Sequence, residues 1–174
     1  MKIMTVFGTR PEAIKVAPVI NETGKYPGKL TCINCVTGQH REMIGPLLKL
    51  FNIQVNYDLN IMVENQSLEH ITTAVLTKMK DIIAKEKPDY LLVQGDTTTA
   101  MAASLAAYYN KVKVAHIEAG LRTHDKLNPY PEEVNRKIID SVSDIYFAHT
   151  EHAKQNLLVE GVAENKIEVT GNTV

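Results

Sequence analysis

Short apolar segments alternate with longer segments of helical periodicity along the whole sequence, and this alternation constrains the fold more than any other feature. The apolar segments predict strands at residues 2–7, 29–36, 90–94, 113–117, 145–148 and 166–169, with a weaker strand at 56–60. The periodic segments predict helices at residues 12–22, 43–51, 67–86, 98–109, 132–142 and 151–160. The alternation predicts an α/β fold, a Rossmann-like doubly wound parallel sheet of about seven strands, in one domain over residues 1–174.

The order of the strands follows from right-handed crossover connections if the weak segment at 56–60 is the third strand. The order is then 3-2-1-4-5-6, with a seventh strand at the end. The strands that end at Gln94 and Ile117 become neighbours, about 5 Å apart. Open α/β sheets bind ligands at the carboxyl edge of their strands, so that edge is where a site is expected.

Polar clusters follow the predicted strands at this edge. They are residues 8–12, 37–40, 95–98, 118–123, 149–152 and 170–172. The first cluster leads into a helix whose free N–H groups and positive dipole end suit a phosphate, and Arg10 and Lys15 add two cations. We favour phosphate binding here over ordinary surface charges at a helix start.

Two carboxylates directly follow neighbouring strands, and a third heads a helix after a proline-bracketed loop. Asp96 and Glu118 are the first two, and Glu132 is the third. They could approach one substrate from two directions. Each also has a structural alternative, because Asp96 could cap the helix at 98–109, Glu118 could pair only with Arg122, and Glu132 could only complement a helix dipole.

The remaining features exclude several classes of protein. The 19 basic and 20 acidic residues leave a net charge of -1, which gives no reason to expect nucleic acid or an anionic membrane as partner. The sequence has no secretory signal and no run of about 18 apolar residues, so we expect a cytoplasmic protein. The first turn has a single glycine, Gly8, which disfavours a nicotinamide-dinucleotide site.

Cysteine and histidine give no sign of a metal or redox site. Cys32 and Cys35 lie three apart in a predicted strand, where they point to opposite faces, so we interpret them as structural thiols. His116 lies inside an apolar strand, and we interpret all six histidines as structural or solvent-facing.

Four motifs together make the sequence similar to the non-hydrolysing UDP-N-acetylglucosamine 2-epimerases. They are GTRPE at 8–12, GDT at 95–97, HIEAGLRT at 116–123 and PEEVNR at 131–136. Members have two Rossmann-like domains that face each other across a cleft, as in B-type glycosyltransferases. The resemblance covers the whole of this chain but about half of a typical member, so we expect the C-terminal domain to be absent and this chain alone to be inactive.

The resemblance also implies a reaction and its partners. Members interconvert UDP-N-acetylglucosamine and UDP-N-acetylmannosamine, and the latter feeds cell-envelope polysaccharides. The reaction is anti elimination of UDP followed by its re-addition, with the C2 proton delivered to the other face, and it needs neither nicotinamide nor metal. The intact enzyme is expected to be a homodimer.

Individual residues of this sequence match functional positions of the family. Asp96, Glu118 and Glu132 match the catalytic carboxylates, and Arg10 and Lys15 match contacts to the nucleotide sugar.

A regulatory site is also implied, since some members bind a second substrate molecule as an activator. Gln39, His40 and Gln66 match segments of that site. Members with this pattern often carry Gln where Glu42 stands and Arg where Asn65 stands, so two positions depart from it.

Three other functions remain open at this point. A glycosyltransferase of the same architecture is one, although it leaves three carboxylates at one cleft unexplained. A hydrolysing epimerase, which releases free N-acetylmannosamine, is another. The third is a non-catalytic domain that serves in binding or assembly.

Overall fold

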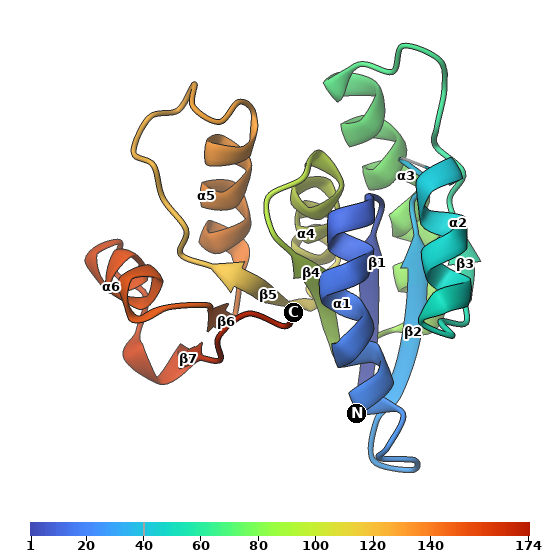
Figure 1. Ribbon diagram of the computed structural model, residues 1–174, viewed down its shortest axis with the longest axis horizontal. Helices are drawn as coiled ribbons and strands as arrows, with labels where there is room; N and C mark the ends of the chain where they lie inside the picture. Colours follow the sequence, from blue (N-terminus) through green and yellow to red (C-terminus); the bar gives the residue numbers. More distant parts are fainter. Residues whose placement is uncertain (40) are drawn as a thin grey trace.

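A seven-stranded parallel sheet forms the centre of the computed structural model, which describes residues 1–39 and 41–174 (Figure 1). Its order is β3-β2-β1-β4-β5-β6-β7, and β3 and β7 lie at its opposite ends. The strands are β1 Lys2–Phe7, β2 Thr31–Val36, β3 Tyr57–Asp58, β4 Tyr90–Gln94, β5 Lys113–Ala119, β6 Ile145–Ala148 and β7 Ile167–Val169. The predicted α/β fold and strand order, including the weak third strand, are confirmed.

Six helices connect the strands, and local sequence signals set several of their ends. They are α1 Arg10–Thr23, α2 Arg41–Leu50, α3 Leu68–Glu86, α4 Thr98–Tyr109, α5 Glu132–Val142 and α6 Glu151–Val159, and a 3-10 turn, Glu164–Lys166, precedes β7. The hydroxyls of Ser67, Thr97 and Thr150 accept backbone N–H groups at the starts of α3, α4 and α6. Lys87, with φ of 48°, ends α3 in the left-handed region.

Three predicted strand starts are too early by one or two residues, and for the strands predicted at 29–36 and 166–169 the reason is the same. The second strand begins at Thr31 rather than 29, because the amides of Lys29 and Leu30 close a turn on the carbonyl of Tyr26. The last strand begins at Ile167 because the amide of Lys166 bonds the carbonyl of Ala163 in the 3-10 turn. A turn hydrogen bond therefore removes each of these residues from the sheet.

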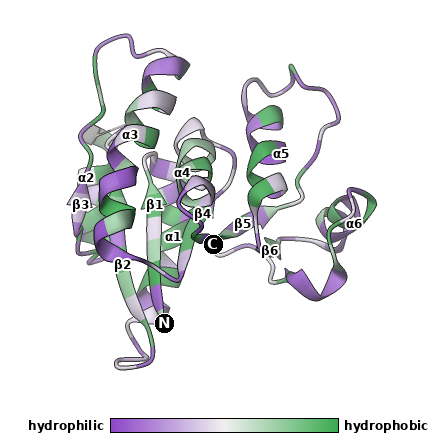
Figure 2. Cartoon of the chain, turned by 180° about the vertical axis from the view of Figure 1, so that it is seen from behind, coloured by the Kyte–Doolittle hydropathy of each residue, from purple (hydrophilic) through white to green (hydrophobic). Residues whose placement is uncertain are grey.

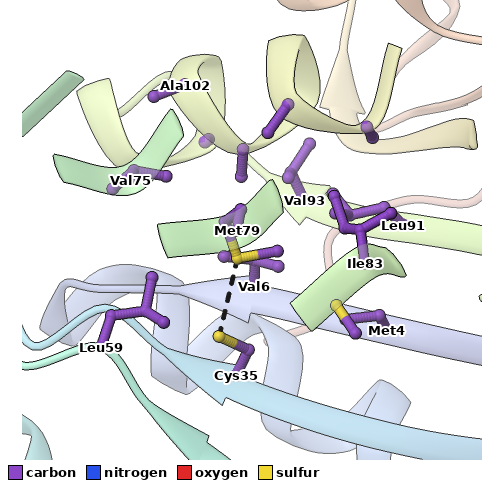
Figure 3. Close-up of a cluster of buried hydrophobic side chains, with 14 of the residues drawn as sticks. Met4, Val6, Cys35, Leu59, Val75, Met79, Ile83, Leu91, Val93 and Ala102 are labelled. Atoms are coloured by element: carbon purple, nitrogen blue, oxygen red, sulfur yellow. Dashed lines mark hydrogen bonds between the residues drawn. The ribbon is translucent and has the colours of Figure 1, made fainter. Parts of the chain in front are cut away.

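The largest hydrophobic cluster lies between the sheet and the helices α3, α4 and α5 (Figure 3). Met4 and Val6 alternate along β1 so that both enter this cluster, where Met79 of α3 meets them. Cys35 also belongs to it, with its Sγ 3.8 Å from Sδ of Met79, and burial raises the pKa of this thiol to about 12. Cys32 packs instead against the cluster under α1 and α2, so the predicted opposite faces are confirmed.

The helices on the other face cover only part of the sheet. α1 and α2 pack over Phe7 and Val36, and α1 buries the residues of one side. On the opposite face of the sheet, α3 likewise carries both hydrophobic and hydrophilic residues (Figure 2). Beyond α1, apolar side chains that include Ile3, Leu92 and Phe147 line a groove of about 390 Å³. The last residues of the chain run back from β7 toward the middle of the sheet (Figure 1).

Membrane insertion finds no support in the helices. Within residues 1–39 and 41–174, none of them is both long and apolar enough to span a bilayer.

Candidate active site

A polar cleft of about 350 Å³ lies at the carboxyl edge of the sheet, where a site was predicted. The start of α1, the ends of β4 and β5 and the start of α5 form its walls. Its lining residues are Thr9, Pro11, Glu12, Lys15, Gln39, Leu68, Gln94, Gly95, Asp96, Thr97, Thr98, Glu118, Pro131 and Glu132. The structure thus brings the three predicted carboxylates and Lys15 into one cavity.

Glu118 is presented to the cleft by an irregularity in β5. The pairing of β5 with β6 shifts in register between Ile117 and Ala119, and Glu118 has a φ of 71°. Regular alternation would send Glu118 toward α5, on the same side as His116. The bulge instead directs its carboxylate to α1 and β4, as bulges near functional sites commonly do.

The carboxylate of Glu118 is held by two long side chains. Nζ of Lys15 lies 2.8 Å from each of its oxygens, and Nε2 of Gln94 donates to Oε2 at 2.5 Å. The side chains of Lys15 and Glu118 are 25% and 17% exposed, so this ion pair is largely shielded from water. The alternative that Glu118 pairs with Arg122 is wrong, since Arg122 pairs with Asp140 and Glu160.

Asp96 has its own cation. Nη2 of Arg136 donates to Oδ2 of Asp96 at 2.6 Å, and Nδ2 of Asn135 donates to the Asp96 carbonyl at 2.9 Å. The alternative that Asp96 caps the following helix is wrong, because the hydroxyl of Thr97 accepts the amide of Ala100 there. With a side chain 27% exposed, Asp96 is accessible from the cleft.

Glu132 stands in the first turn of α5, half-buried, and lines the cleft from the side of that helix. Its position also complements the helix dipole, so the structural alternative for this residue fits its placement. Its neighbour Glu133 faces away and accepts the amides of Thr123 and His124, which fastens the long loop before α5.

The start of α1 differs from the phosphate site that the sequence suggests. Glu12 is fully buried there, and its Oε2 accepts the amides of Gly8 and Thr9 while its Oε1 accepts the hydroxyl of Thr97. Burial raises the pKa of Glu12 against the lowering effect of these hydrogen bonds. Arg10 is exposed and is not among the described residues that line the cleft. Lys15 is therefore the predicted cation that the cleft contains.

The predicted regulatory residues lie beside the same cleft. Nε2 of Gln66 donates to the backbone carbonyl of Gln39 at 2.9 Å, and the hydroxyl of Thr99 donates to Oε1 of Gln39 at 2.7 Å. In the described part of the chain, Oε1 of Gln66 is buried and has no hydrogen-bond partner. His40 lies outside the described residues.

Three residues of the site escaped the sequence analysis as functional candidates. Gln94 ends an otherwise apolar strand, and that single polar residue was the available signal. Arg136 and Glu12 lie inside two of the four motifs, in which neighbouring residues were the functional candidates. Gln94 donates to Glu118 and Arg136 pairs with Asp96, which orients these two carboxylates, whereas Glu12 accepts the Thr97 hydroxyl and fixes the turn after β4 to the start of α1.

The positions of the two carboxylates suit proton transfer to and from a bound substrate. Asp96 and Glu118 sit at the ends of adjacent strands, on separate turns, so a substrate between them meets two carboxylates from different directions. Among residues 1–39 and 41–174, no cluster of three or more His, Cys, Asp or Glu side chains could hold a metal ion.

Comparison with known proteins agrees with this geometry. Residues 24–174 match the family described as UDP-N-acetylglucosamine 2-epimerase. The UDP-N-acetylglucosamine 2-epimerase of Neisseria meningitidis serogroup A is 55% identical over 174 residues, which are 100% of this chain and 46% of that protein. The chain thus spans about half the length of the curated relatives it matches.

Solved structures give the same result. The UDP-GlcNAc 2-epimerase of Neisseria meningitidis bound to UDP-GlcNAc superposes with a TM-score of 0.95 at 54% identity, over 99% of this chain and 47% of that one. The enzyme of Methanocaldococcus jannaschii in complex with UDP-GlcNAc and UDP gives 0.92 at 40% identity, over 99% and 47%.

A more distant likeness concerns the fold alone. MurG of Acinetobacter baumannii matches with a TM-score of 0.60 at 15% identity, over 84% of this chain and 40% of that one, in keeping with half of a B-type glycosyltransferase architecture. The family match, by contrast, covers most of the sequence. From its motifs, its fold and these matches, the chain belongs to the UDP-N-acetylglucosamine 2-epimerase family.

Proposed function

We propose that the protein to which this chain belongs interconverts UDP-N-acetylglucosamine and UDP-N-acetylmannosamine, and that this chain supplies the acid–base groups. The observation that carries the proposal is the placement of Asp96 and Glu118 on neighbouring turns of one cleft, each beside its own cation. Solved relatives hold UDP-GlcNAc, which supports a nucleotide sugar as the substrate. Because the chain spans about half of these relatives, we propose a second domain that completes the cleft.

The proposed reaction moves one proton and breaks and remakes one bond. A carboxylate removes the proton from C2 of the sugar while the C1–O bond to UDP breaks, which gives 2-acetamidoglucal and UDP. UDP then returns to C1, and an acid delivers a proton to C2 from the opposite face. A C2 proton is weakly acidic, so the base must be held in place, and inversion needs a second group on the other face.

The charged residues in and near the cleft have separate parts in this proposal. Asp96, Glu118 and Glu132 form the set from which base and acid are drawn. Lys15 orients Glu118 and brings positive charge to the cleft, where it favours the departing diphosphate. Arg136 orients Asp96 in the same way, through a charged hydrogen bond. Arg10, exposed at the start of α1, is proposed to meet the nucleotide only once the cleft is closed by the second domain.

The wider setting is also proposed from the family. The product would supply cell-envelope polysaccharide synthesis in the cytoplasm, the intact enzyme would be a homodimer, and no cofactor would be needed. A second nucleotide-sugar molecule would bind near Gln39, His40 and Gln66 as an activator. The orphaned Oε1 of Gln66 supports this, since a ligand group could satisfy it.

A chimaera provides the test. This chain replaces the matching half of the Neisseria meningitidis relative, with which it shares 55% of its residues. The chimaera is incubated with UDP-N-acetylglucosamine in deuterated water, and the recovered sugars are analysed by NMR and mass spectrometry. We expect UDP-N-acetylmannosamine and UDP-N-acetylglucosamine that both carry deuterium at C2.

The other outcomes point to the other functions. Free N-acetylmannosamine as the product would indicate a hydrolysing epimerase, and transfer of the sugar to an added acceptor would indicate a glycosyltransferase. A folded chimaera that binds the substrate but leaves C2 unlabelled would contradict the proposal and favour a binding role. The unmodified Neisseria enzyme, run in parallel, shows that the assay works.

A further inference from the structure

His116 is completely buried in β5 and both of its ring nitrogens are engaged. Nδ1 lies 2.6 Å from Oδ1 of Asp140 in α5, and Nε2 lies 2.7 Å from the backbone carbonyl oxygen of Gly95. Each ring nitrogen therefore lies within hydrogen-bond distance of an oxygen from a different element. The imidazole thus bridges α5 to the turn that follows β4.

The Gly95 end of this bridge fixes the turn that carries Asp96. Gly95 has a φ of 72°, and its amide donates to the carbonyl of Ile117 at 2.9 Å. Its carbonyl, which belongs to the peptide bond joining Gly95 to Asp96, accepts from His116. Both sides of Gly95 are therefore fastened to β5, the strand that also carries Glu118.

The Asp140 end of the bridge fixes the turn that carries Glu118. Oδ2 of Asp140 accepts the amide of Gly120 at 3.2 Å and Nη2 of Arg122 at 2.7 Å. Glu118, two residues before Gly120, has the left-handed φ of 71°, which costs free energy for a residue with a side chain. Such a conformation persists only where its surroundings fix it, and the Asp140 hydrogen bonds supply that fixation on one side.

We propose that His116, together with Asp140, is a positioning residue that holds the Asp96 turn and the Glu118 turn in a fixed relation. The inference rests on the proposed function, because it gives the two carboxylates their geometry toward one sugar carbon. It revises the interpretation of His116 as a merely structural histidine. A ring that only filled the core could bond any nearby acceptor, whereas both bonds of His116 lead to turns that line or support the cleft.

Two substitutions separate the two bonds. In His116→Gln the amide nitrogen reaches about as far as Nε2, so the bond to the Gly95 carbonyl is kept and the Asp140 bond is lost. In His116→Asn the amide reaches about as far as Nδ1, so the Asp140 bond is kept and the Gly95 bond is lost. Tyr146→Phe is the matched control, because its buried hydroxyl bonds the carbonyls of Asp140 and Ser143 without touching either turn.

The variants are measured in the chimaera for kcat and KM, and in this chain for melting temperature. We expect His116→Asn to lower kcat about 100-fold with a much smaller change in KM, because a displaced catalytic group loses rate more than binding. We expect His116→Gln to recover at least a tenth of the parental kcat, and Tyr146→Phe to lower the melting temperature while its kcat stays near the parental value.

Three outcomes would overturn the inference. The first is equal kcat values for His116→Asn and His116→Gln, and the second is a His116→Asn variant as active as the parent. The third is a Tyr146→Phe variant whose kcat falls with its melting temperature as steeply as in the His116 variants. If His116→Asn does not fold, amide exchange in His116→Gln decides, since the Gly120 amide should exchange faster and unchanged exchange contradicts the bridge. An inactive parental chimaera would contradict the proposed function. Exchange of the Gly120 amide in His116→Gln would still test whether His116 bridges the two turns.

Discussion

Lys15 contacts both carboxylate oxygens of Glu118, and Arg136 contacts one oxygen of Asp96. A carboxylate has about four lone-pair positions, so three donors from Lys15 and Gln94 leave Glu118 able to accept a further proton. The cations orient these two carboxylates through charged hydrogen bonds and offset part of the repulsion that a diphosphate would meet in the cleft. At the scale of single residues, this arrangement is what the proposed proton transfer requires.

The first prediction concerns these two carboxylates. In the chimaera, Asp96→Asn and Glu118→Gln should each lower kcat by about 100-fold to 10,000-fold, with a far smaller effect on KM. An amide nearly preserves the size of the carboxylate and still forms hydrogen bonds, but it cannot exchange the C2 proton. Steady-state kinetics and C2 deuterium exchange measure the effect, and Asp81→Asn, an exposed substitution in α3, is the control. Near-normal exchange in both variants would reassign Asp96 and Glu118 to structural roles.

At the scale of elements, sequence reasoning succeeded where a boundary has its own chemistry. Ser67 marks the start of α3, and the alternation of strands and helices gave the sheet order that brings Asp96 next to Glu118. The bulge at Glu118 could not be predicted, because a left-handed glutamate has no compositional mark. The contact of Lys15 with Glu118 joins residues 103 apart and depends on how α1 is oriented, which no pattern of spacing specifies.

The turn after β5 gives the second prediction. Gly120 has a φ of 80°, and a Cβ added there would lie 2.2 Å from the carbonyl oxygen of Ala153 in α6. Gly161 has a φ of 88° with no atom within 4 Å of such a Cβ, so it is a matched control for backbone strain. Gly161→Ala should cost about 1–2 kcal/mol of unfolding free energy. Gly120→Ala should cost about 1–3 kcal/mol more from overpacking.

Urea unfolding of this chain measures both variants. Equal losses of unfolding free energy would mean that α6 can move away from the turn. The close packing of α6 against Gly120 would then not contribute to stability.

The link between α5 and β5 gives the third prediction, which depends on pH. Burial alone would raise the pKa of Asp140, but the charges and hydrogen bonds of His116 and Arg122 outweigh it and lower that pKa below its ordinary value of 3.8. A lowered pKa in the folded state gives stability that is present above 3.8 and lost as the pH falls through the folded value. Asp140→Asn should therefore cost about 3–5 kcal/mol near pH 7, because it breaks the buried ion pair with Arg122 and leaves Glu160 as the remaining partner of that guanidinium.

The difference between parent and Asp140→Asn should shrink as the pH falls below 3.8, since the parent then loses its charge as well. Urea unfolding from pH 7 to pH 3 follows this difference, and exposed Asp81→Asn shows the background. A difference that stays constant with pH would mean that Asp140 contributes by shape and not by charge.

At the scale of the whole molecule, the cleft contains polar and charged side chains that suit a sugar and a phosphate. Its described lining contains Thr, Gln, Lys and acidic side chains with a few aliphatic ones, and no aromatic ring on which a uracil could stack. The chain also spans about half of its curated relatives. We therefore expect most of the uridine contacts to come from the proposed second domain.

Binding of UDP tests whether most uridine contacts come from the proposed second domain. This chain alone should bind UDP with a Kd weaker than about 1 mM, which corresponds to roughly -4 kcal/mol and is all that a few charged contacts supply after the cost of association. The chimaera should bind at least ten times more tightly, because its second domain contacts the uridine while this chain still contacts the phosphates. Isothermal titration calorimetry on both proteins measures the two constants, and Lys15→Met, which removes the cation of the cleft, should weaken binding to the chimaera further. Tight binding of UDP to this chain alone would place the uridine site here, and the proposed role of the second domain would then be wrong.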